Sequence, residues 1–406
     1  MSDSTAQHEI PAEWRAARRI LAVRLDNLGD VLVTSPAIRA VRHAIPEASI
    51  TLLASPAGAQ AARLNPDIDD VIVYQAPWMD PWQRLPQDLE RERRVAEELR
   101  GRGFDAAVIF TALRQSPMAS AYLCYTAGIP LRLGAAGGGL GSLLTHTYRH
   151  QPPEDMRHEV LRCLDLVGAV GMANPEPDLV LAPPAEARAS LEQRLVSVGL
   201  PALTAHGSWL TAPLVVLHPG CSMAARTYPA ELFARAADLL VERLGATVAI
   251  TGSEEERPLA ERVRSAMRRP AHALAGALSF AELCALIDAA DLVLTNNTGP
   301  MHIAAARKTP VAVPFALTNQ PSQWHPWRVP HRLLYHEVPC RICYSKECPT
   351  DHACLLRVDP EQVAAAAEEL LAGATDDRRR ATDEAFPERP LLYAPGLDAA
   401  VGSRRS

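Results

Sequence analysis

The segment TNNTGPMH, from Thr295 to His302, has the residue types and spacing of a phosphate-binding turn. It joins an apolar run to a helical pattern, and a helix start of this kind presents free backbone N–H groups to an anion. Thr298 adds a hydroxyl donor, and Gly299 lets the backbone approach a ligand closely. His302, one turn into the helix, can reach a phosphate or a sugar. A histidine taken alone is more often an ordinary helix residue, so both interpretations stay open.

The loop DNLGD, from Asp26 to Asp30, is a second candidate. A carboxylate at Asp30 could take a proton from a hydroxyl group if partial burial raises its proton affinity. It could instead cap the following helix, and this is the commoner role for an aspartate just before or within the first turn of a helix. Gly29 either permits close approach of a substrate or is an ordinary turn glycine.

Short apolar runs that alternate with helical patterns must position these loops. The runs cover residues 20–25, 49–55, 70–74 and 105–110 in the first half, and 213–220, 246–252, 291–297 and 309–315 in the second. Such runs read as parallel strands buried on both faces, and ligands of such sheets bind outside the carboxyl ends of the strands. A proline-rich stretch at 173–188 is the best linker between the halves.

Composition excludes several classes of protein. The 406 residues are 48% hydrophobic and 22% charged, which fits a folded chain of two domains. The formal net charge of −6 argues against a dedicated nucleic-acid binder. No apolar run reaches the roughly 20 residues of a membrane span, and the N-terminus has no signal-peptide core. We expect a cytoplasmic protein with at most peripheral membrane contact.

Four of the eight cysteines are clustered in the pattern C-x2-C-x4-C-x5-C. They are Cys340, Cys343, Cys348 and Cys354. Four thiolates could hold a structural zinc ion, but only one C-x-x-C pair is present, so reduced structural cysteines are the favoured interpretation. We expect no metal in the chemistry.

Four motifs in order resemble glycosyltransferase family 9, the ADP-heptose-dependent heptosyltransferases. The motifs are RLDNLGDVLVTSPAIRAVR, HPGCSMAARTYPAELF, TNNTGPMHIAAARKTPVAVPF and PCRICYSKECPTDHACLLRVDPEQV, and they span roughly residues 20 to 370. The resemblance implies an α/β fold of the GT-B type, with two Rossmann-like doubly wound domains that face each other across a cleft. It also implies inverting transfer of a heptose or related sugar from an ADP-sugar to an acceptor hydroxyl, without a cofactor.

The resemblance assigns roles to residues. Asp30 is the catalytic base, and Asp26, Asn27 and Gly29 form the acceptor-side loop. Arg226 corresponds to a basic residue that neutralises the departing diphosphate. The other donor-binding positions are Gly220, Ser222, Thr251, Gly252, Ser253, Glu254, Asn297, Thr298, Gly299, Pro300, Met301 and His302. Glu254 could hold ribose hydroxyls or belong to a plain polar loop. Asn297 departs from the aspartate of many relatives, which leaves the donor's identity open.

The expected organisation is a mobile tail at 1–19, an acceptor-binding domain at 20–183, a nucleotide-sugar-binding domain at 184–374, and a tail at 375–406 that could cross back. The partners are a nucleotide-sugar donor and a glycan or lipid-linked acceptor, such as lipopolysaccharide core, and we expect a monomer. Two alternatives remain: a nucleotide-sugar epimerase of GT-B-like shape, and a non-catalytic sugar-nucleotide-binding protein.

Overall fold

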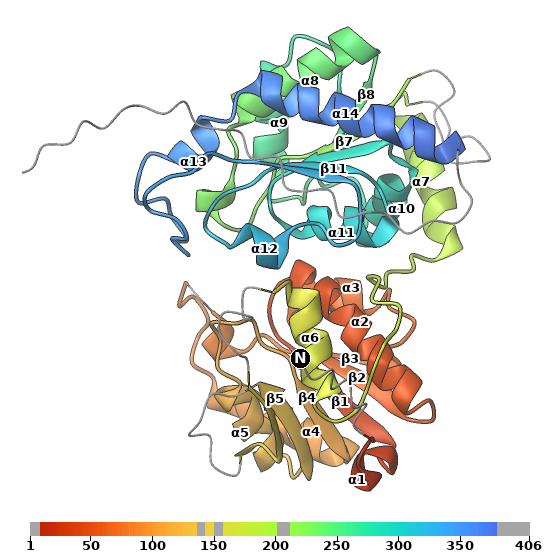
Figure 1. Cartoon of the computed structure of the whole chain (residues 1–406), viewed down its shortest axis with the longest axis vertical. Coiled ribbons are helices and arrows are strands. Elements are labelled where there is room, and N and C mark those ends of the chain that lie inside the picture. Colours follow the sequence, from red (N-terminus) through yellow and green to blue (C-terminus); the bar gives the residue numbers. More distant parts are fainter. Residues whose placement is uncertain (1–8, 81, 136–142, 150–156, 201–211, 380–406) are drawn as a thin grey trace, which may run out of the picture.

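The computed structural model describes residues 9–80, 82–135, 143–149, 157–200 and 212–379. These residues form two α/β domains stacked one above the other, with the first half of the chain in one and the second half in the other (Figure 1). Each domain has one six-stranded sheet. No helix within these ranges is long and apolar enough to cross a bilayer.

The sheet of the first domain has the order β3-β2-β1-β4-β5-β6, and all its pairs are parallel. Its strands are β1 Arg19–Arg24, β2 Ser49–Ala54, β3 Asp70–Val73, β4 Ala106–Ile109, β5 Leu131–Ala135 and β6 His146–Tyr148. Its helices are α1 Ala12–Arg15, α2 Leu28–Ala44, α3 Pro56–Ala62, α4 Leu89–Arg102, α5 Met118–Thr126 and α6 Glu159–Gly168, with a 3-10 turn η1 at Pro77–Met79.

The second domain repeats the topology, with the order β12-β11-β10-β7-β8-β9 and parallel pairing throughout. Its strands are β7 Leu214–His218, β8 Thr247–Ile250, β9 His272–Ala273, β10 Leu292–Thr295, β11 Val311–Pro314 and β12 His331–Leu334. Its helices are α7 Ala185–Ser197, α8 Ala230–Leu244, α9 Arg257–Ala266, α10 Phe280–Ala289, α11 Gly299–Arg307, α12 Pro321–Trp324, α13 Ala353–Leu356 and α14 Pro360–Arg379, and a 3-10 turn η4 covers Ala224–Arg226.

Both sheets therefore have the strand order of a dinucleotide-binding fold, which confirms the prediction of two doubly wound domains. The order in which strands are added to the sheet reverses between β1 and β4 in the first sheet and between β7 and β10 in the second, although all the strands run in the same direction. Loops that leave the carboxyl ends of these four strands line a crevice in such folds. The candidate residues at 26–30, 218–226 and 296–302 lie at the ends of three of these strands, in the connecting loops and the first turns of the helices that follow.

Helices α8 and α10 begin and end at the residues that the sequence predicts. Ser279 and Glu282 form a capping box at the start of α10, in which Glu282 accepts the backbone N–H of Ser279 at 2.7 Å. Gly245 ends α8 with a φ of 65°, a left-handed conformation that glycine adopts without steric cost. Pro229 precedes the first residue of the same helix.

The expected boundaries need correction at the N-terminus. We expected residues 1–19 to be a mobile tail, but Trp14 on α1 is completely buried in the first domain and its indole N–H faces His146 Nδ1 at 3.4 Å. The folded part therefore begins several residues before 20. At the other end, α14 continues to Arg379 and packs on α8 and β11 of its own domain. Residues 1–8, and the segment 380–406 that could cross back, lie outside the described residues.

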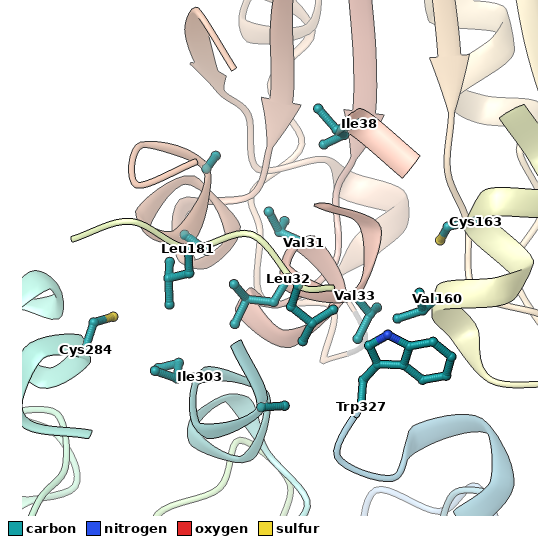
Figure 2. Packing of buried hydrophobic residues seen from close by; sticks show 14 of the residues in the cluster. Val31, Leu32, Val33, Ile38, Val160, Cys163, Leu181, Cys284, Ile303 and Trp327 are labelled. Atoms are coloured by element: carbon teal, nitrogen blue, oxygen red, sulfur yellow. The ribbon is translucent and has the colours of Figure 1, made fainter. Parts of the chain in front are cut away.

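Apolar side chains join the two domains along α2 and α11. Figure 2 shows Leu32 and Val33 of α2 close to Ile303 of α11 and to Trp327, and all four belong to one buried cluster. A polar contact reinforces this packing, because the ring N–H of His158 donates to the backbone carbonyl of His325 at 2.9 Å. The packing fixes how the loops of one sheet face those of the other.

Candidate active-site cleft

A cleft of about 360 Å³ lies between the domains and is lined by residues that follow β1, β4, β7 and β10, the strands at which the strand order of each sheet reverses. This volume is within the range of small-molecule sites. From the first domain, it is lined by Asp26, Asn27, Gly29 and Asp30 after β1 and by residues 112–115 after β4. From the second, it is lined by Ser222, Met223 and Arg226 after β7 and by Asn297, Thr298, Gly299, Met301 and His302 after β10. The structure thus brings together most of the residues singled out from the sequence.

Asp30 holds two contacts and still faces the cleft. Its Oδ2 accepts the backbone N–H of Asn27 at 3.0 Å, so it does help to cap α2, as the third residue of the helix. Its Oδ1 lies 3.0 Å from Arg24 Nη2. About 15% of the side chain stays exposed, and the carboxylate keeps lone pairs for a further hydrogen bond. The capping role is therefore observed, and the role as a base stays a prediction.

Arg24 is a site residue that opens the first motif but was given no role in the sequence analysis. It is completely buried at the end of β1 and contacts Asp26 at 2.8 Å, Asp30 at 3.0 Å and Glu159 at 3.3 Å. Burial alone would lower the pKa of Arg24, but these carboxylates raise it. Burial raises the pKa of Asp26 to about 6 and that of Glu159 to about 7, against the pull of Arg24. The one available signal was a charged residue within the apolar run ILAVRL.

Arg226 is a cation that no carboxylate of the described residues neutralises by direct contact. Its Nε donates to Thr318 Oγ1 at 2.9 Å, and its Nη2 donates to Asn319 Oδ1 at 2.8 Å, so neutral oxygens hold it at the cleft wall. Burial lowers its pKa. A half-buried guanidinium with only neutral partners has positive charge left over for an anion that binds beside it. This arrangement indicates an anionic ligand.

Two further polar atoms in the cleft are buried and make no hydrogen bond to the described residues. They are His302 Nδ1 and Asn297 Nδ2. Asn297 uses its Oδ1 to accept the N–H of Ala316 at 3.4 Å. Burial lowers the pKa of His302 to about 4, so its ring is neutral near pH 7. Buried polar atoms without partners are rare in folded proteins and indicate that a ligand completes them.

His302 also fixes the approach of the two domains. A β-carbon on Gly29 would lie 2.6 Å from His302 Cδ2, so only a glycine permits this contact between α2 and α11. Gly29 is therefore required by the packing of the two domains, which neither interpretation from the sequence included.

Several expected donor residues do not line the cleft in the described structure. Gly220, Thr251, Gly252, Ser253, Glu254 and Pro300 are in this group. Glu254 is exposed and paired with Arg257, whereas Glu256 turns back toward the carboxyl ends of β7 and β8. The Glu256 carboxylate accepts the N–H of Ser253 at 2.8 Å and lies 3.5 Å from His218 Nε2. Nothing in the run of three glutamates indicates which one faces inward.

The cysteine cluster forms no metal cage in the described part of the chain, where no three potential ligands gather. Cys348 Sγ instead accepts the N–H of His352 at 3.2 Å and organises its own loop. The same segment reaches the cleft, because the ring of Tyr344 lies 4.2 Å below the guanidinium of Arg114 from the first domain.

A family model and several curated relatives indicate one family. The family model described as glycosyltransferase family 9 (heptosyltransferase) matches residues 92–354, well over half of the chain. Lipopolysaccharide heptosyltransferase 3 of Escherichia coli K12 is 25% identical over 84% of this chain and 95% of its own length. A family 9 glycosyltransferase structure from Veillonella parvula superposes with a TM-score of 0.72 at 21% identity, covering 90% of this chain and 100% of that one. An E. coli heptosyltransferase, WaaC, solved with ADP, gives a TM-score of 0.60 at 18% identity, covering 87% and 99%.

Proposed function

Since the chain belongs to glycosyltransferase family 9, the heptosyltransferases, we propose that it moves a heptose or related sugar from an ADP-sugar to an acceptor hydroxyl with inversion at the sugar carbon. We place the acceptor in lipopolysaccharide core or a similar glycoconjugate, as the names of its relatives suggest. We also place the reaction in the cytoplasm, with at most peripheral membrane contact. The proposal rests above all on Arg226, the half-buried cation of the cleft that lacks a carboxylate partner among the described residues.

The chemistry follows from the two sides of the cleft. Asp30 takes the proton of the acceptor hydroxyl as its oxygen attacks the sugar carbon. The bond from that carbon to the diphosphate breaks, and ADP leaves with the electron pair. Arg226 and the positive end of the α11 dipole meet the negative charge that develops on the diphosphate.

The buried nitrogen atoms of Asn297 and His302 that lack partners among the described residues orient the donor. Asn297 Nδ2 donates to a donor oxygen, and the neutral His302 ring offers Nδ1 to a phosphate or sugar group. We place the nucleoside toward the ends of β7 and β8, where Glu256, rather than Glu254, faces the ligand side. Its carboxylate is suited to accept hydrogen bonds from ribose hydroxyls.

Release of ADP from ADP-heptose, measured with and without lipopolysaccharide core acceptors, tests the proposal. Asp30→Asn keeps the shape of the site but removes the base, so turnover should fall by about 10²- to 10⁴-fold with ADP affinity unchanged. Asp165→Asn is a matched control, because Asp165 is a partly buried aspartate on α6 paired with Arg157, outside the cleft lining. It should keep wild-type turnover.

The alternatives predict other results. ADP-sugar binding without turnover on any acceptor would indicate a non-catalytic binding protein. Conversion of the sugar without an acceptor would indicate an epimerase. Full turnover in Asp30→Asn would remove Asp30 from the mechanism.

A further inference from the structure

The segment around Tyr344 crosses from the second domain to the first at the edge of the cleft, and the proposed reaction does not use it. The ring of Tyr344 lies 4.2 Å from the guanidinium carbon of Arg114, and both residues line the cleft. A second contact joins the same two domains, because Lys346 Nζ lies 5.0 Å from the centre of the Trp82 ring. Tyr344 is 40% exposed, so these cation–π contacts lie where the cleft meets solvent.

On the second-domain side, the backbone of this segment is attached to the residues that hold Arg226. The N–H of Tyr344 donates to the carbonyl of Thr318 at 3.1 Å, and the hydroxyl of Thr318 accepts Arg226 Nε at 2.9 Å. The carbonyl of Lys346 accepts the N–H of Ala225, the residue before Arg226, at 3.1 Å. The place of Tyr344 is therefore fixed relative to the Arg226 guanidinium.

On the first-domain side, Arg114 is attached to the loop that carries the proposed base. Its neighbour Gln115 donates from Nε2 to Asp26 Oδ1 at 2.5 Å, and Asp26 opens that loop after β1. The contact between Arg114 and Tyr344 thus completes a chain of contacts that runs from the loop of the base, around the edge of the cleft, to the wall that carries Arg226.

The backbone of Tyr344 indicates that the place of this ring is specified. Its φ is 51°, in the left-handed region, which residues with a β-carbon seldom adopt because the β-carbon is crowded there. Two backbone hydrogen bonds hold it, from Tyr344 to Thr318 and from Cys343 to Leu317 at 3.3 Å. Conformations of this kind persist where the surrounding structure fixes them, and they are concentrated at functional sites.

We propose that Tyr344 is a positioning residue for the transfer, which binds Arg114 across the cleft and so keeps the wall that carries Arg226 in register with the loop of the base. The inference rests on the proposed function, in which the base and Arg226 act on one pair of substrates from opposite walls. ADP alone binds to the second-domain wall, whereas transfer needs both walls. Loss of the contact should therefore lower turnover and leave ADP affinity unchanged.

Two variants of Tyr344 test the inference, with ADP-heptose and an acceptor as substrates. Tyr344→Leu removes the ring but keeps the backbone hydrogen bonds, so kcat should fall by about three- to tenfold while the ADP dissociation constant from calorimetry stays at the wild-type value. Tyr344→Phe keeps a ring that attracts a cation, so it should keep most of the wild-type kcat. Arg114→Met should lose as much as Tyr344→Leu, and the double variant should lose no more than either.

Tyr125→Leu is the matched control. Tyr125 also faces an arginine, since the guanidinium of Arg132 lies 5.4 Å from the centre of its ring, but both belong to the first domain, outside the cleft lining. This variant should keep the wild-type kcat. A merely structural role for Tyr344 would lower the free energy of unfolding without lowering kcat, and that result would overturn the inference. Additive losses in the double variant would overturn it as well, because Arg114 would then act without Tyr344.

¹⁹F NMR of enzyme labelled with fluorotyrosine gives a readout that needs no turnover. The Tyr344 signal is identified by its loss in Tyr344→Phe. It should shift in Arg114→Met, which removes the cation from the ring, and stay in place in Tyr125→Leu. An unshifted signal in Arg114→Met overturns the inference whether or not a substrate pair is found. Failure of the proposed function appears separately, as full turnover in Asp30→Asn.

Discussion

Gly29→Ala is the change whose effect the geometry of the domain interface determines most directly. The added β-carbon would lie 2.6 Å from His302 Cδ2, whereas nonbonded carbon atoms rest about 3.5–4.0 Å apart. The His302 ring or the whole of α11 must therefore move by about 1 Å. The ring has little freedom, because it is buried and lies against Trp324 at 6.3 Å between ring centroids.

The size of the effect follows from two terms. Overpacking of a tight contact costs about 1–3 kcal/mol, and the better helix propensity of alanine returns about 0.5–1 kcal/mol. We expect the free energy of unfolding to fall by about 1–2 kcal/mol. A displacement of about 1 Å between Asp30 and the donor side of the cleft should lower kcat/KM by up to about 10²-fold.

The assay combines denaturant unfolding with ADP-release kinetics. Gly101→Ala is the matched control, since Gly101 is also a helical glycine and a β-carbon there meets nothing within 4 Å. It should raise stability slightly and leave kcat/KM unchanged. His302→Ala removes the ring, so the stability cost of Gly29→Ala should disappear in the double variant.

Wild-type stability and kcat/KM in Gly29→Ala would refute the reasoning. So would a cost of Gly29→Ala that is the same with and without the His302 ring. Either result would mean that α2 and α11 do not meet through these two residues in the working enzyme.

Three other predictions follow from the same structure. Arg226→Met should weaken ADP binding by about ten- to a hundredfold by calorimetry, since a hydrogen bond to a charged group contributes about 1.5–3 kcal/mol, and Arg226→Lys should lose less. Burial raises the pKa of Glu159 from 4.5 in the unfolded chain to about 7 in the folded protein. Below about pH 4.5 the carboxyl is protonated in both states and does not affect the free energy of unfolding. Above pH 7 it is ionised in both states, and its burial lowers the free energy of unfolding by about 3 kcal/mol. The stability difference between Glu159→Gln and wild type should therefore grow in favour of the variant from pH 5 to pH 8, and a flat difference in denaturant titrations would contradict this. Trp14→Ala should cost about 3–5 kcal/mol of unfolding free energy, because Trp14 is wholly buried, whereas a mobile tail would lose almost nothing.

The features that could be predicted from the sequence alone are those that depend on residues close together in the chain. The continuous apolar runs indicated buried parallel strands, and Ser279 with Glu282 indicated the start of a helix. The glycine-containing turns after these runs placed Asp30, Arg226 and His302 at the carboxyl ends of strands. These signals are local, because strand burial and helix capping depend on residues a few positions apart.

Only the tertiary structure decided which side chains of the site contact one another. Arg24 meets Glu159 from 135 residues away, Glu256 rather than Glu254 turns inward, and Gly29 touches His302 across the two domains. No sequence pattern predicts these contacts, because each joins elements that are brought together only when the chain folds. The contact between Gly29 and His302 depends in addition on how the two domains pack through α2 and α11. The residue types needed for chemistry could be read from the chain, but burial and shared partners, which set their charge and proton affinity, arise only from the packed fold.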